Sequence, residues 1–202
     1  MPLSLATVGG KITATFINLI IGQVNRQGLT AIIPTSVAGT GVTLGSGGKV
    51  AISSGGATAS VNGCFTSDFA NYLIKVSTTH STGGTLFMRL RLSGTDAAGA
   101  SDYVQTTLSA GGTSAVVASP STTSMNLDSN SVTGHVGSVQ LENPAVAAAT
   151  YFVGDKFRNS TGGWQDVGGR HILTTAYDGF TILAGAGTIT SGTIRIYGYN
   201  DN

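Results

Sequence analysis

The sequence predicts an all-β protein, a jelly-roll-like antiparallel β-sandwich preceded by a short N-terminal α-helix. From Leu29 onward, apolar and polar residues alternate in short runs separated by Gly-rich turns, which is typical of strands in a sandwich. Before that point the apolar spacing is three and four residues, which indicates a helix. The 202 residues suit one principal core, so we expect an N-terminal segment at 1–28 and a β-sandwich domain at 29–202.

The predicted helix lies within Gly10–Gly28, and Gly28 stands where a helix C-terminal glycine is common. Two interpretations of its apolar stripe remain open: packing on its own domain, or association with copies of itself. Ile17 and Ile21 lie on a second face and give more apolar surface than one contact requires, which favours an anchoring or oligomerising role. The residues that we expect to form the stripe are Ile12, Phe16, Leu19, Ile20, Gln23 and Val24.

The clearest strand signals lie in the middle of the chain. Asn71–Thr78 alternates with Tyr72, Ile74 and Val76 on one face, and Thr85–Leu92 alternates in the same way. We expect the short connection between them, residues 79–84, to close a hairpin, and we interpret 143–163 as a loop or one helical turn followed by a long surface connection. Further strands are predicted at 30–34, 41–44, 49–53, 103–108, 114–118, 123–127, 135–142, 170–175, 179–184 and 193–199.

The charge content excludes several function classes. Only 9% of the residues are charged and the net charge is +1 without a Lys/Arg cluster, so we expect no binding to nucleic acid or to an anionic membrane surface. No apolar run approaches the roughly 18 residues of a membrane span, and the N-terminus does not resemble a secretory signal. A single cysteine, Cys64, excludes an internal disulfide framework. We therefore expect synthesis in the cytoplasm.

The same lack of charge favours assembly. Soluble monomeric domains usually carry about 25% charged residues, so a chain with 9% must rely on neutral polar groups or cover its surface in an oligomer. We expect a homo-oligomer.

The strand region contains four distinctive stretches: Val61–Tyr72, Met88–Asp96, Tyr177–Thr181 and Gly192–Tyr199. These stretches resemble virion structural proteins of tailed bacteriophages. In this group a short N-terminal helical segment precedes a β-rich domain, and members are labelled minor tail, fibre or decoration proteins. The resemblance implies a non-enzymatic place in the virion. We expect a homotrimeric subunit, made in the host cytoplasm and in contact with other capsid or tail proteins, and both a tail fibre and a capsid decoration protein remain open.

Catalytic and metal-binding patterns are weak. His80, His135 and His171 are far apart in the sequence and have no accompanying cysteines, so we predict no metal site and no cofactor. The acidic residues Asp96, Asp102, Glu142, Asp155 and Asp166 have no spacing that supports a glycosidase pair. We predict that Cys64 is a buried apolar residue and that the chain is not an enzyme.

Two residue groups remain as candidate contact sites. Arginines within strands need an acidic partner, solvent or an interface, so Arg89, Arg91 and Arg195 are predicted to form structural or intersubunit ion pairs. The alternative function is a carbohydrate-binding or host-receptor-binding module. Its predicted contacts are the aromatic residues Tyr151, Phe157 and Trp164.

Overall fold

A computed structural model describes residues 28–110, 115–158 and 164–200. Its described strands form one 14-stranded sheet in which every pair is antiparallel, so the predicted all-β class is confirmed. The strands are β1 Thr30–Ala31, β2 Ser36–Ala38, β3 Val42–Leu44, β4 Val50–Ile52, β5 Thr58–Asn62, β6 Asn71–Leu92, β7 Thr95–Asp96, β8 Tyr103–Ala110, β9 Ala115–Thr122, β10 Met125–Glu142, β11 Thr150–Arg158, β12 Trp164–His171, β13 Gly179–Ala184 and β14 Ile189–Tyr199. A 3₁₀ turn at Ser46–Gly48 joins β3 to β4.

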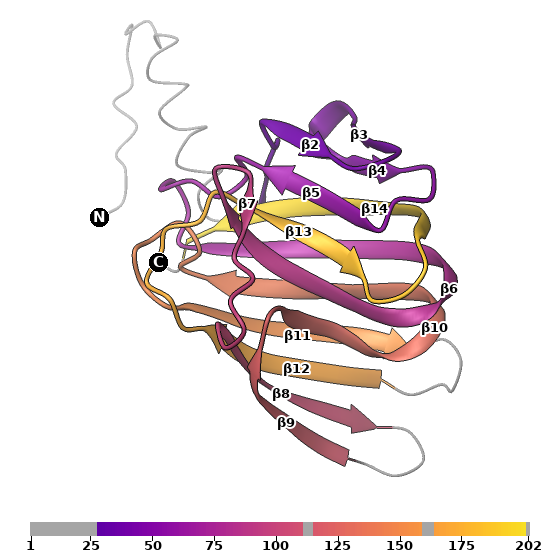
Figure 1. Ribbon diagram of the computed structural model, residues 1–202. Coiled ribbons are helices and arrows are strands. Elements are labelled where there is room, and N and C mark those ends of the chain that lie inside the picture. Colours follow the sequence, from indigo (N-terminus) through magenta and orange to yellow (C-terminus); the bar gives the residue numbers. More distant parts are fainter. Residues whose placement is uncertain (1–27, 111–114, 159–163, 201–202) are drawn as a thin grey trace, which may run out of the picture.

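Two long strands, β6 and β10, hold the fold together. They pair from Asn71↔Glu142 to Met88↔Met125, and the register shifts between Asn126 and Gly134. On its other edge β6 pairs first with β14 and then with β13. Figure 1 shows the long strands turning over at one end of the molecule. The sheet therefore folds onto itself at this bend, and β6 and β10 continue through the bend without a break in the strand.

The first half of β6 belongs to a wide layer that continues through β10, β11, β12, β8 and β9 on one side, and through β14, β4 and β3 on the other. The second half of β6 belongs to a smaller layer with β13, β5 and β2. Alternate residues of both layers meet in one hydrophobic core. Its fully buried large side chains include Tyr72, Ile74, Met88, Leu90, Leu141, Phe152, Phe180 and Ile182.

The predicted hairpin at 79–84 is wrong, because β6 continues through it as one strand. A hairpin would pair 71–78 with 85–92. Instead, β10 on one edge and β14 and β13 on the other provide the pairing partners of both halves. Long-range pairing of this kind leaves no signal in the local sequence, whereas the hydroxyl-rich and glycine-containing connection imitates a turn.

The predicted surface connection at 150–163 is also wrong in part, because Thr150–Arg158 forms β11 and Trp164 begins β12. The loop prediction for 143–149 is confirmed. The strand predicted at 170–175 lies earlier, at Trp164–His171. Glycines and charged residues inside β11 and β12 interrupt the alternation of apolar and polar residues that predicts a strand. Hydrogen-bonded pairing with β10 and β8 stabilises these strands although their intrinsic strand propensity is low.

The predicted helix at Gly10–Gly28, with its apolar stripe, lies almost entirely outside the described residues. The boundary between segments 1–28 and 29–202 therefore stays a prediction. Within the described ranges, no helix is long and apolar enough to cross a membrane.

Candidate functional site

The wide layer has one face in the core and one face toward solvent. We call the solvent side of β14, β6, β10, β11 and β12 the outer face. On β6, for example, Ile74 and Val76 are buried, whereas Lys75 between them is exposed. The register of the five strands places these residues of the outer face in adjacent positions: Leu73, Lys75, Val136, Ser138, Gln140, Tyr151, Val153, Asp155, Asp166 and Arg195.

One line of directly opposite residues crosses the outer face and carries most of its charge. In order from β14 to β12 it contains Arg195, Lys75, Ser138, Asp155 and Asp166. We call this line the charge row. Its two cations are directly opposite each other on neighbouring strands, and so are its two carboxylates. Because β10 lies between them, the row is positive on one side of Ser138 and negative on the other.

The positive half of the charge row lies in a groove of about 410 Å³. Among the described residues no ion pair involves Lys75 or Arg195. On the far side of the groove, the Ser138 hydroxyl donates a hydrogen bond of 2.5 Å to Asp155 Oδ1. The lining combines cations, a carboxylate and hydroxyls, which suits the binding of polar or charged groups. The lining residues are Lys75, Val76, Ser77, Val136, Gly137, Ser138, Asp155, Thr193 and Arg195.

Apolar residues flank the charge row. Val136 and Val153 are each 62% exposed, and Tyr151 is 47% exposed. Tyr151 and Arg170 line a second, shallower groove of about 340 Å³ over β8, β11 and β12. The outer face therefore combines charge with exposed apolar surface, as protein interfaces and ligand-binding faces do.

The structure brings the predicted glycan residues onto neighbouring strands. Tyr151 is opposite Arg170, and Phe157 is opposite Trp164 in the β11–β12 register. The side chains of Phe157 and Trp164 lie outside the described part of the chain. The register therefore places Phe157 beside Trp164 but leaves Tyr151 six residues away along β11, about 20 Å. The glycan contact stays a prediction.

The three predicted arginines differ in their surroundings. Arg195 belongs to the charge row. The Arg89 guanidinium donates to the Thr123 carbonyl at 3.1 Å. Arg91 forms an ion pair of 2.5 Å with Asp96 inside its own chain, and its side chain is only 12% exposed. Arg91 also donates to oxygens of Asn62, Ser60, Thr181 and Gly94.

Arg91 therefore joins β5, β7 and β13 to β6. This position gives Arg91 a structural role within the chain, and an intersubunit role for any of the three arginines stays a prediction.

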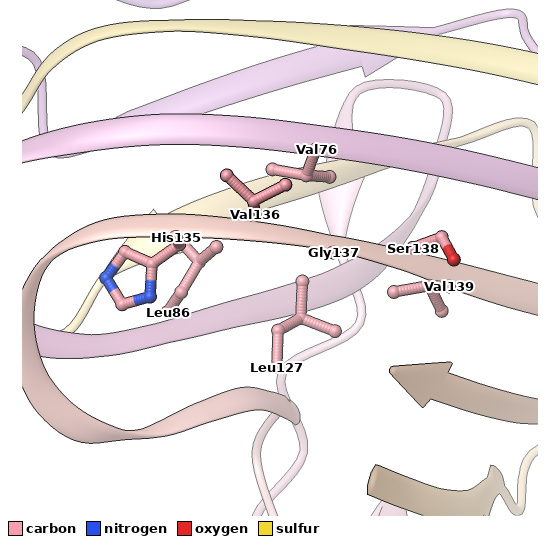
Figure 2. Close-up of a pocket in the computed structure, with 8 residues that line it drawn as sticks. All are labelled: Val76, Leu86, Leu127, His135, Val136, Gly137, Ser138 and Val139. Carbon is pink, nitrogen blue, oxygen red and sulfur yellow. The ribbon is translucent and has the colours of Figure 1, made fainter. Parts of the chain in front are cut away.

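Two histidines that are distant in the sequence meet at the bend of the fold. The rings of His80 and His135 are 4.4 Å apart between centroids, and both side chains are buried. His135 also lines a cavity between the two halves of β6 and β10, whose lining Figure 2 shows. The cavity volume of about 10 Å³ corresponds to roughly one water molecule. It is too small for a substrate.

The third histidine, His171, belongs to a buried cluster at the other end of the wide layer. Its ring lies edge-on to Tyr103 and Tyr177, with centroids 4.5 and 5.1 Å away. Asp102 Oδ2 is 3.9 Å from His171 Nε2. Burial lowers the pKa of His171, although Asp102 acts in the opposite direction. The cluster is closed to solvent and its role is to pack the end of the sheet.

The remaining chemical candidates do not converge. Cys64 is fully buried, as predicted, and burial raises the pKa of its thiol, which disfavours the reactive thiolate. Asp155 and Asp166 are opposite each other, but on an open sheet face. Asp96 is held by Arg91. The described residues contain no group of three or more His, Cys, Asp or Glu side chains that could hold a metal ion.

Comparison with known proteins adds no assignment: no family model, no curated protein and no solved structure matches this chain. Sequence reasoning selected Arg195 but missed the charge row around it. The available signal was the charged residue between apolar neighbours in Ile74-Lys75-Val76 and Ile194-Arg195-Ile196. The register that aligns these two segments comes from the fold alone.

Proposed function

We propose that this protein is a non-enzymatic structural subunit of a tailed-bacteriophage virion, either a tail fibre or minor tail protein or a capsid decoration protein. In this proposal residues 1–28 attach a homotrimer to the particle, and the β domain faces outward. The proposal draws on the resemblance of four strand-region stretches to virion proteins. Synthesis takes place in the host cytoplasm, and the partners are capsid or tail proteins and other copies of this chain.

The outer face is the observation that carries the assembly role. A chain with 9% charged residues places two cations and two carboxylates in one row of an exposed sheet and leaves valines 62% exposed beside them. Neither feature is needed to close the core, which lies on the opposite face of the same strands. Surface that the fold does not use for its own stability is typical of interaction sites.

The folded-over antiparallel sheet supports a jelly-roll-like sandwich as the finer description of the fold. In a jelly roll, long strands pair along their length and fold over as a unit. β6 and β10 pair across the bend in this manner. The sandwich then serves as a rigid platform that presents the outer face.

Imaging of the purified particle tests the proposal directly. We expect density for the β domain on the head or tail surface, and wild-type protein that sediments as a trimer at low concentration. Polar substitutions of Phe16 and Leu19 should weaken trimer formation or particle attachment while the circular dichroism of the β domain is retained. A serine at Ile33, which is 65% exposed, is the control and should change neither property. A monomeric wild-type protein that is absent from particles would contradict the proposal.

The second candidate function is a carbohydrate-binding module of a phage appendage that recognises a host surface glycan. The backbone register supports it in part, because Phe157 and Trp164 are directly opposite each other on two paired strands and Tyr151 lies on the same strand as Phe157. Tyr151 is 47% exposed on the outer face, and an exposed aromatic ring is suited to stacking on a sugar ring. Glycan-array binding that is lost on replacement of Tyr151 by Ala would support this function, and the absence of any bound glycan would exclude it.

A further inference from the structure

The charge row contains two unfavourable contacts. Like charges directly opposite each other on neighbouring strands destabilise a sheet, yet Arg195 is opposite Lys75, and Asp155 is opposite Asp166. No ion pair within the described ranges relieves the two cations. Within one chain these two pairs are unfavourable, which favours a partner of opposite charge that covers the face.

The row is also complementary to itself. Ser138 on β10 is its midpoint, with Lys75 one strand away on one side and Asp155 one strand away on the other. Arg195 and Asp166 are each two strands from β10. A rotation of 180° about an axis parallel to β10 exchanges the two halves. A second copy placed face to face by this rotation would bring every cation of the row opposite a carboxylate.

We propose that the outer face pairs with the same face of a second copy across a two-fold axis parallel to β10. The inference rests on the proposed assembly function and adds a second contact to the one made by residues 1–28. Because a two-fold axis cannot relate the chains of one trimer, this contact joins chains of two different trimers. Lys75 of each copy is opposite Asp155 of the other, and Arg195 is opposite Asp166. An axis perpendicular to the strands would place like charges together, so the row selects one of the two face-to-face arrangements.

The apolar residues agree with the same axis. Val153 on β11 and Leu73 on β6 lie one strand to either side of β10 at the same level, because both are aligned with Gln140. The rotation therefore places Val153 of one copy over Leu73 of the other. Residues of β10 lie on the axis, so Val136 meets Val136, and the exposed Glu142 at the end of β10 meets Glu142. Facing sheets pack about 10 Å apart, a spacing that valine and leucine fill, and the contact buries side chains that are 62% exposed in the single chain.

Charge reversal tests the pairing. The variant Lys75→Glu/Arg195→Glu makes the row negative throughout, and Asp155→Lys/Asp166→Lys makes it positive throughout. Each variant alone should lose face-to-face association by more than about tenfold, because like charges meet across the interface. An equimolar mixture should restore it. Lys49→Glu, on a connection outside the outer face, is the control and should retain wild-type assembly.

Sedimentation velocity at several concentrations measures the outcome, and near-UV circular dichroism verifies that each variant is folded. If a reversed variant does not fold, Lys75→Gln/Arg195→Gln and Asp155→Asn/Asp166→Asn replace the pair and should each weaken association. Restoration in the mixture supports the inference. Loss of association without restoration would overturn it, as would variants that assemble like wild type.

The failure of the inference can be told apart from the failure of the proposed function. A wild-type trimer that the charge variants leave unchanged overturns only the pairing. A wild-type monomer at all concentrations overturns both. Binding of trigalacturonate, an acidic oligosaccharide, that is lost in Lys75→Glu/Arg195→Glu without a change in assembly would assign the groove to a glycan instead of a second copy.

Discussion

The same strands form both faces of the wide layer, but the two faces differ in composition and exposure. On β6 and β14, Ile74 and Ile196 are buried in the core, whereas Lys75 and Arg195 beside them are exposed in the charge row. The inner face is apolar, continuous and shared with the smaller layer. The outer face carries like charges directly opposite each other in the register. The contrast shows that the core uses one face of these strands, and association through the other face is our proposal.

A substitution on the inner face should cause the largest loss of stability. Phe180 is fully buried on β13 and stacks near Phe65, with ring centroids 5.9 Å apart. Phe180→Ala should lower the free energy of unfolding by about 4 kcal/mol, through lost burial and a cavity. Urea denaturation at fixed protein concentration measures it. Val153→Ala, on the outer face, is the control, and a similar loss there would remove the distinction between the faces.

Removal of the Arg91 ion pair should cause the second largest loss of stability. Arg91→Met leaves the Asp96 carboxylate, which is 22% exposed, without its cation, and should cost about 3 kcal/mol of unfolding free energy. Arg89→Met is the matched control, because Arg89 bonds only to Thr123 among the described contacts, and should cost about 1 kcal/mol or less. Equal costs for the two arginines in urea denaturation would show that Arg91 does not join the strands around it.

Acidification should act through the buried His171 cluster. Burial lowers the pKa of His171 in the folded state below its ordinary value of 6.5, so the unfolded chain binds the proton more readily. The stability contribution of neutral His171 is therefore complete above pH 6.5 and is lost as the pH falls below it. His171→Gln should flatten this part of the stability profile relative to wild type. Parallel profiles for the two proteins between pH 7 and 5 would refute the assignment.

The smallest effect should come from the outer face. Lys75→Thr removes the like-charge contact with Arg195 and adds a β-branched residue, so the free energy of unfolding should rise by about 0.3 kcal/mol at low ionic strength. Salt should reduce the gain, because exposed charges are screened. Thermal unfolding at two salt concentrations, at a protein concentration too low for face-to-face pairing, measures the change. A loss of stability above 1 kcal/mol would mean that Lys75 serves the fold after all.

Sequence patterns predicted the parts of the fold that local alternation encodes. Tyr72, Ile74 and Val76 are buried as expected, and residues 179–184 form the predicted strand. The continuous β6 and the strands β11 and β12 were not predictable, because their pairing partners are distant in the sequence. The charge row depends on five strands being in register, so its residues could be predicted as exposed but not as neighbours.

Cross-linking between copies tests most directly whether the outer face pairs with a second copy. Arg195 and Asp166 are four strands apart within a chain, about 19 Å, but only about 10 Å apart across the proposed two-fold axis. Arg195→Cys and Asp166→Cys chains, mixed and treated with a short bis-maleimide, should form a covalent heterodimer, whereas Arg195→Cys chains alone should not. The buried Cys64 should not react. Equal cross-linking in both samples, or none in either, would contradict the face-to-face pairing.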